Sequence, residues 1–173
     1  SSLELNENTP FNFNNSNPYI KSQQMIEEII RDTVKTDNEW NVAILRIGNV
    51  VGAFEQAVLG EFVQPLPKNI VSLALQVATM QRDYIELQQS AQTEDQTVER
   101  SFVHVLDVCD AIFASLYWFN HQKNVCESFD IGGYSLSIQQ ILTEIEKVTG
   151  QQIKTIEATY SFDELDQIGS NSS

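Results

Sequence analysis

The chain has 173 residues, which suits one domain or a large part of one. Its formal net charge of −14 argues against nucleic acid and anionic membranes as partners, because both require clustered cations. The hydrophobic content of 42% is sufficient for a core, and no apolar run approaches the roughly 20 residues that span a bilayer.

The cysteines and the first residues of the sequence indicate the cellular compartment of the protein. The first 15 residues have neither the basic region nor the apolar stretch of a signal peptide. Cys109 lies in an apolar run and Cys126 in an expected strand, which predicts two buried thiols rather than a disulfide. We therefore expect an intracellular, reducing compartment, either the mitochondrion or the cytoplasm. Two scattered histidines predict no metal site.

The first half of the chain begins with a polar, Asn-rich arm at residues 1–17. A helix is expected to start at Pro18, with Ser16 or Asn17 as its cap. Its apolar stripe consists of Met25, Ile26, Ile29, Ile30 and Thr33. Residues 40–53 form a β-branched run that predicts one strand buried on both faces, as in a parallel sheet.

The second half of the chain alternates helices and strands. Asp107 is expected to cap an apolar helix whose aromatic residues belong to the core or to an interface. Ser137 and Gln140 form a capping box, and Gly150 ends the helix that follows. The expected helices are 68–81, 108–120 and 137–150, and the expected strands are 83–88, 101–105, 128–133 and 152–158. This alternation predicts an α/β domain over 18–168 and a disordered tail at 169–173.

Five segments carry a resemblance to a known family. They are "NPYIKSQQMIEEIIRD", "WNVAILRIGNVVGA", "PLPKNIVSLALQVA", "TEDQTVERSFVHVLDVCDA" and "FDIGGYSLSIQQILTEIEKVTG". In this order they resemble blocks of the UDP-glucose 4-epimerases and related extended short-chain dehydrogenases, the NAD-dependent epimerase/dehydratase family. The resemblance implies an incomplete Rossmann-like parallel sheet plus a small substrate-side α/β subdomain.

Such families begin with a G-x-x-G-x-x-G turn that holds the pyrophosphate of NAD, and the sequence lacks this motif. We therefore expect the C-terminal, substrate-side half of such a protein. An incomplete parallel sheet exposes an apolar edge, which folded proteins avoid. The expected partner is another protein chain, either the N-terminal Rossmann half or a subunit of a large assembly. No cofactor is assigned, since NAD is expected only if that partner supplies the glycine-rich half.

Tyr19 occupies the position of the family's catalytic Tyr, whose pKa is lowered by a Lys four residues later. Here that position is Gln23, and Lys21 lies about 200° around the helix from Tyr19. An unassisted phenol is almost fully protonated at neutral pH and is a poor base. Tyr19 is therefore interpreted as vestigial, an aromatic residue packed at a helix start.

The resemblance also implies three substrate-binding residues. Asn49 and Asn69 fall on positions that contact the sugar nucleotide, although the aromatic residues before Asn49 are replaced by Ile47 and Gly48. Arg100 falls on a diphosphate-binding Arg, and the Asp that follows it in the family is Ser101 here. An ion pair with a nearby acidic residue is an equally acceptable role for Arg100. No Arg follows Arg100, so the family's second diphosphate Arg is missing.

These departures predict a degenerate, non-catalytic epimerase-like subunit with a structural role in a larger assembly, by analogy a mitochondrial one. The alternative is one part of a two-chain NAD-dependent 4-epimerase acting on UDP-glucose and UDP-galactose. A binding module for sugar or acidic ligands is the third hypothesis, and the charge of the chain disfavours it.

Overall fold

The computed structural model describes residues 17–37, 39–62, 67, 69–90, 93–158 and 167–168. All of the predicted arm except Asn17 lies outside these residues, and so does the tail at 169–173. The prediction of one domain over 18–168 stays a prediction. No helix in the described ranges combines the length and the apolar character needed to cross a membrane.

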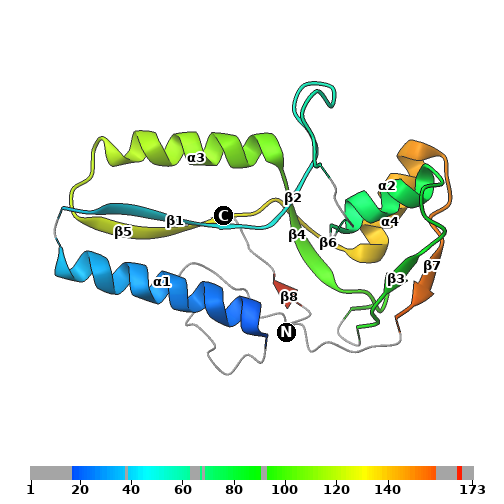
Figure 1. Cartoon of the computed structure of the whole chain (residues 1–173), viewed down its shortest axis with the longest axis horizontal. Helices are drawn as coiled ribbons and strands as arrows, with labels where there is room; N and C mark the ends of the chain where they lie inside the picture. The colour runs from blue at the N-terminus through cyan, green and yellow to red at the C-terminus, as the bar shows by residue number, and fades with distance from the viewer. Residues whose placement is uncertain are drawn as a thin grey trace.

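Two parallel strands lie between two helices in one half of the molecule. β1 (Asn41–Ile47) and β5 (Val125–Ile131) pair residue by residue along their whole length. Helix α1 (Pro18–Thr36) covers one face of this pair, and helix α3 (Val105–Phe119) covers the other (Figure 1). The parallel pairing and the three layers confirm the predicted α/β class.

The strand expected over 40–53 is interrupted at Gly48. β1 ends before it, and the chain continues as β2 (Asn49–Val51), which pairs in parallel with β4 (Glu99–His104) in a second sheet. The expectation of burial on both faces is wrong for β1, where only Ile44 is buried. The reason is that β1 has a single strand neighbour among the described residues, which leaves its side chains partly exposed.

The second sheet contains a strand that the sequence did not predict. β6 (Tyr134–Ser137) runs antiparallel to β4, and β8 (Gln167–Ile168) runs parallel to it. The four residues of β6 end at Ser137, which is also the N-cap of α4, and their sequence resembles that of a loop. Pairing with β4 therefore decides their conformation, which is a tertiary effect that local pattern does not encode.

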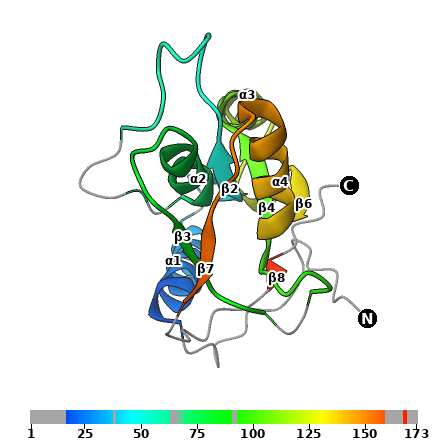
Figure 2. The same cartoon turned by 90° about the vertical axis from the view of Figure 1, so that its right-hand side faces the viewer.

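A smaller lobe is built around the other two helices. α2 (Ile70–Ala78) packs against α4 (Ile138–Thr149), and β3 (Ile85–Leu87) pairs in parallel with β7 (Thr155–Glu157) (Figure 2). The buried residues of this lobe form one apolar cluster: Ala74, Val77, Ala78, Ile85, Leu142, Ile145 and Ile153. The predicted small α/β subdomain therefore has a core of its own.

The helix ends test the predicted caps. The Asn17 side chain accepts hydrogen bonds at the start of α1, and the predicted capping box and the Gly150 end of α4 are both present. The predicted cap of α3 is wrong. His104 is the cap, and its Nδ1 accepts the Leu106 N–H at 3.2 Å. Asp107 lies in the first turn instead, where its carboxylate still complements the helix dipole.

Two expectations about burial are also wrong. Cys109 is exposed on α3, and Cys126 is only half-buried in β5, although both thiols are free as predicted. Of the predicted apolar stripe of α1, Met25, Ile26, Ile29 and Thr33 are exposed, whereas Ile30 is half-buried. The only buried residue of α1 is Val34. The sheet-facing side of α1 also carries charged side chains, which are described below.

Candidate functional site

The candidate site lies where β1 ends. Ligands of open parallel sheets bind beyond the carboxyl ends of the strands. In Figure 1 the N-terminal end of α1 and the carboxyl end of β1 lie toward the same side of the molecule. This arrangement brings the first turn of α1, with Tyr19, to the same end of the sheet as the β1–β2 junction.

Tyr19 is held by its backbone rather than by its phenol. Its N–H donates to Oδ1 of the cap residue Asn17 at 2.9 Å, and the Tyr19 residue is 72% exposed. Gln23, at the position of the family's Lys, is also exposed. Lys21 is half-buried and lies on another side of the helix. Neither of these two neighbours on the helix therefore supplies a cation at the position where the resemblance requires one.

A charged network joins α1 to the sheet, and the sequence did not predict it. The carboxylate of Glu27 accepts from Nε and Nη2 of Arg46 at 2.9 Å each, and Arg46 lies 3.8 Å from Asp130. Arg31 lies 4.0 Å from Glu27 and donates to the Ser128 hydroxyl. The side chains of Glu27 and Asp130 are 13% and 8% exposed. Arg31 and Arg46 are thus engaged in holding α1 against β1 and β5.

The predicted substrate-binding residues have structural partners. The Asn49 amide donates to the Ser101 carbonyl at 3.3 Å. Asn69 caps α2 by accepting from the Val71 N–H at 3.0 Å, and its amide donates to the Val50 carbonyl at 2.9 Å. Asn49 therefore links β2 to β4, and Asn69 links the start of α2 to β2. These structural roles neither require nor exclude contact with a ligand.

Arg100 lies in the middle of the second sheet. It is half-buried in β4, opposite Leu136 of β6 and Ile168 of β8. The structure thus places Asn49 and Arg100 on adjacent paired strands, β2 and β4, and places Asn69 at the end of α2. The roles of these three residues in substrate binding stay predictions.

Close backbone packing surrounds the β1–β2 junction. A Cβ atom at Gly48 would lie 2.9 Å from the Ser101 carbonyl oxygen, and one at Gly133 would lie 2.2 Å from the Phe102 carbonyl oxygen. Real side chains do not fit at such distances, so both glycines allow β4 to approach. The sequence identified Gly48 and Ser101 as separate departures from the family pattern, but only the fold shows that they are in contact.

A second polar cluster fixes the loop that leads into β4. Asp95 accepts from the Thr97 N–H at 3.0 Å, from the Thr97 hydroxyl at 2.8 Å and from the Ser137 hydroxyl. Partial burial acts to raise the pKa of Asp95. The hydrogen bonds from Ser137, Thr97 and Thr93 outweigh this effect, so the pKa lies below its usual value. The cluster ties residues 93–97 to the start of α4.

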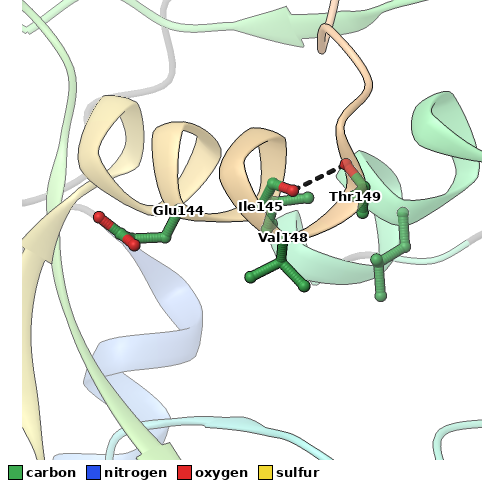
Figure 3. A pocket seen from close by; sticks show the side chains of 5 residues that line it. Glu144, Ile145, Val148 and Thr149 are labelled. Carbon is green, nitrogen blue, oxygen red and sulfur yellow. Dashed lines mark hydrogen bonds between the residues drawn. The ribbon is translucent and has the colours of Figure 1, made fainter.

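A small hollow on the other lobe does not belong to this site. It has a volume of about 190 Å³ and is lined by Leu75 of α2 together with four residues of α4, namely Glu144, Ile145, Val148 and Thr149 (Figure 3). The Thr149 hydroxyl donates to the Ile145 carbonyl at 2.7 Å and so is not directed toward a ligand. In the described part of the chain no cluster of three or more acidic, His or Cys side chains could hold a metal ion.

The fold and this site define a Rossmann-like α/β protein with parallel strands and a small additional lobe. Residues 2–132 match the model of the NAD dependent epimerase/dehydratase family. Because this match covers more than half of the sequence, the chain belongs to the NAD-dependent epimerase/dehydratase family.

Curated relatives and solved structures agree with this assignment. The chain is 32% identical to UDP-glucose 4-epimerase 2 of Arabidopsis thaliana, over 83% of this chain and 41% of that protein. It is 34% identical to the UDP-glucose 4-epimerase of Mus musculus, over 80% of this chain and 40% of that protein. The crystal structure of the Bifidobacterium longum UDP-glucose 4-epimerase in complex with NAD+ and UDP matches 91% of this chain and 47% of its own, with 28% identity and a TM-score of 0.83.

The chain therefore spans about half the length of the relatives that it matches. The predicted assignment to a C-terminal, substrate-side half is wrong. The family model matches from residue 2 onward, which indicates the Rossmann part of the family. The parallel strands β1 and β5 with a helix on each face are the Rossmann-like element that this match includes.

Proposed function

We propose that this chain is a non-catalytic member of the family that serves as a structural subunit of a larger assembly. The observation that carries the proposal is the surroundings of Tyr19. Gln23 stands at the position of the family's charge-supplying Lys, and the arginines of α1 and β1, Arg31 and Arg46, are engaged by Glu27, Asp130 and Ser128. In the resembled mechanism a cation at that position favours the phenolate, which is the form that takes a proton from a sugar hydroxyl.

The residues present do not fit a complete NAD site. The 173-residue sequence has no G-x-x-G-x-x-G turn, and backbone amides of such a turn are what bind the pyrophosphate. Gln23 has no charge with which to replace the Lys. Arg100 is the one Arg of this sequence that the resemblance places at a diphosphate, and a charged hydrogen bond of this kind contributes about 1.5–3 kcal/mol.

The proposed assembly role is supported by surfaces that a free protein rarely exposes. Within the described ranges β1 and β5 pair only with each other. Apolar side chains of α1 and α3 are exposed on both outer sides of this pair, including Ile29 at 65% and Phe113 at 70%. A partner polypeptide that covers these surfaces would remove the edge and the apolar patches together.

The test is purification from the native source, followed by assays of bound NAD and of UDP-galactose interconversion. We expect the chain in an assembly with other polypeptides, without turnover that depends on Tyr19. A free monomer of ordinary stability would refute the assembly role. Turnover that is lost in Tyr19→Phe, but kept in the control Tyr84→Phe near β3, would refute the non-catalytic role.

A second candidate is one chain of a two-chain UDP-sugar 4-epimerase. The similarity to the curated UDP-glucose 4-epimerases favours it, as does the similarity to the Bifidobacterium longum enzyme in complex with NAD+ and UDP. This candidate predicts that Gln23→Lys increases turnover of the assembled protein, whereas the matched surface variant Gln139→Lys on α4 does not. Equal turnover in the wild type and in both variants would contradict the two-chain enzyme and would favour the structural role.

A further inference from the structure

Both histidines of the sequence lie at the ends of helix α3. His104 is the last residue of β4 and the N-cap of α3, and His121 follows shortly after Phe119, the last residue of the helix. In Figure 1, β4 leads directly into α3 beside β2. Histidine is the side chain whose ordinary change of charge falls between about pH 5 and 8. Each end of α3 therefore has a group that changes charge in mildly acidic solution.

The cap of α3 depends on which ring nitrogen of His104 carries a proton. Nδ1 accepts the Leu106 N–H at 3.2 Å, so Nδ1 is unprotonated and the neutral ring carries its proton on Nε2. Protonation of the ring places a hydrogen on Nδ1 and turns this acceptor into a donor. The imidazolium would then lose the Leu106 hydrogen bond and place a positive charge at the positive end of the helix dipole. The cap thus exists only in the neutral form of His104.

The imidazole of His104 also contacts the end of β2. The residue is half-buried and is paired with Val51. A Cβ atom at Gly52 would lie 2.2 Å from both Cδ2 and Nε2 of His104, so the ring packs directly on the Gly52 backbone. Gly52 has a φ of +84°, a conformation that glycine adopts readily. A charge on this ring therefore acts at the junction between α3 and the second sheet.

We propose that His104 makes the first turn of α3 sensitive to pH, so that the turn is capped in neutral solution and opens in mildly acidic solution. This inference goes beyond the proposed assembly role and does not depend on it. Only the neutral ring accepts from Leu106, so the contribution of the cap to stability is present in neutral solution and is lost as the pH falls through the range in which histidine titrates. Opening would loosen the link between α3 and β4, the strand that contains Arg100.

The charged groups around His104 act on the same equilibrium. The carboxylate of Asp107, in the first turn of α3, favours the imidazolium and therefore assists opening in acid. Strands β2 and β8 contain no ionisable residue. The remaining ionisable residues of the segments that adjoin His104 are Glu55, Glu99, Arg100, Cys109, Asp110 and Tyr134. At the other end of α3, a charged His121 complements the helix dipole, so the two histidines should respond to acid with opposite signs.

Hydrogen exchange at the Leu106 amide tests this inference on the whole chain. Exchange is followed by NMR at about pH 7.5 and about pH 5, and each rate is divided by the intrinsic rate of an unprotected amide at that pH. In the wild type we expect the protection of Leu106 to fall about fivefold, which corresponds to about 1 kcal/mol and to the loss of an average cap. His104→Asn, which caps without titrating, should be equally protected at both pH values. The matched control His121→Asn should behave like the wild type.

The outcomes that would overturn the proposal are specific. One is a wild-type Leu106 amide with equal protection at both pH values, and another is an equal fall in the wild type and in His104→Asn. A further measurement needs no variant, because nitrogen-15 chemical shifts of the His104 ring should show its proton on Nε2 at about pH 7.5; a proton on Nδ1 there would refute the cap. Asp107→Asn should move the fall in protection to lower pH, and a fall at unchanged or higher pH would contradict the electrostatic part of the proposal.

Discussion

Replacing Glu27 with Gln is the sharpest test of how α1 is attached to the sheet. The substitution keeps the shape of the side chain and removes its charge. In the structure both carboxylate oxygens of Glu27 accept from Arg46 at 2.9 Å. After the substitution Arg46 loses its two-point ion pair with Glu27 and still lies 3.8 Å from Asp130. The variant therefore weakens the compensation of a partly buried guanidinium group.

The expected cost follows from the burial of the pair. Removing one partner of a fully buried ion pair costs about 3–5 kcal/mol, because the other charge is left in a poorly solvated position. The Arg46 side chain is 25% exposed and retains some water, so we expect a loss of about 2–3 kcal/mol in the free energy of unfolding. For a domain of this size, 1 kcal/mol lowers Tm by about 2–4 °C, which gives a decrease of about 4–12 °C.

Urea and thermal unfolding followed by circular dichroism measure this loss. The matched control is Asp32→Asn, which breaks the exposed pair with Lys35, whose side chains are 67% and 74% exposed. Its cost should be small, because an exposed ion pair contributes little to stability. A double-mutant cycle compares Glu27→Gln, Arg46→Met and the double variant. The coupling energy between Glu27 and Arg46 should be about 0.5–3 kcal/mol. A Glu27→Gln variant as stable as the control would refute the view that this network holds α1 in place.

Three further predictions concern other parts of the fold. Because the pKa of Asp95 is lowered in the folded state, its contribution to stability is present above its unfolded pKa and is lost as the pH falls through the folded pKa. Asp95→Asn should therefore destabilise the chain at pH 7 in urea unfolding and cost progressively less in acid; a pH-independent difference would contradict this. Gly133→Ala should cost about 1–3 kcal/mol because of the contact with β4, whereas Gly60→Ala, whose Cβ lies 3.6 Å from its nearest neighbour, should be nearly neutral by the same assay. His104→Ala should cost about 0.5–2 kcal/mol through loss of the α3 cap and His104→Asn should cost less, and equal losses in the two variants would show that capping is not the role of His104.

The elements with strong local signals were predictable from the sequence. The start of α1, the capping box of α4 and the Gly150 end of α4 each depend on residues within a single helical turn. Periodicity and cap chemistry were therefore sufficient to predict these helix ends. The cap of α3 was missed because His is an uncommon cap and the nearby Asp107 is a frequent one. Local preference thus selected the wrong one of two neighbouring acceptors.

The orientation of α1 could not be predicted for a different reason. Periodicity shows that a helix has an apolar side, but not which surface that side contacts. The sheet-facing side of α1 carries Glu27 and Arg31, whose partners Arg46 and Ser128 are distant in sequence. The apolar residues Met25 and Ile29 therefore lie outward. A sequence pattern that normally marks the core here marks a surface.

The same limit applies to the candidate site, where two departures from the family pattern lie close together. Gly48 and Ser101 stand where the resembled family has Phe and Asp, and a Cβ at Gly48 would lie 3.1 Å from the Ser101 hydroxyl and 2.9 Å from its carbonyl oxygen. A larger residue at position 48 would require β4 to move away, and β4 is held by pairing with β2 and β6. A side chain at position 48 would therefore disturb the second sheet. The missing Cβ at Gly48 is what allows the end of β1 to approach β4 closely.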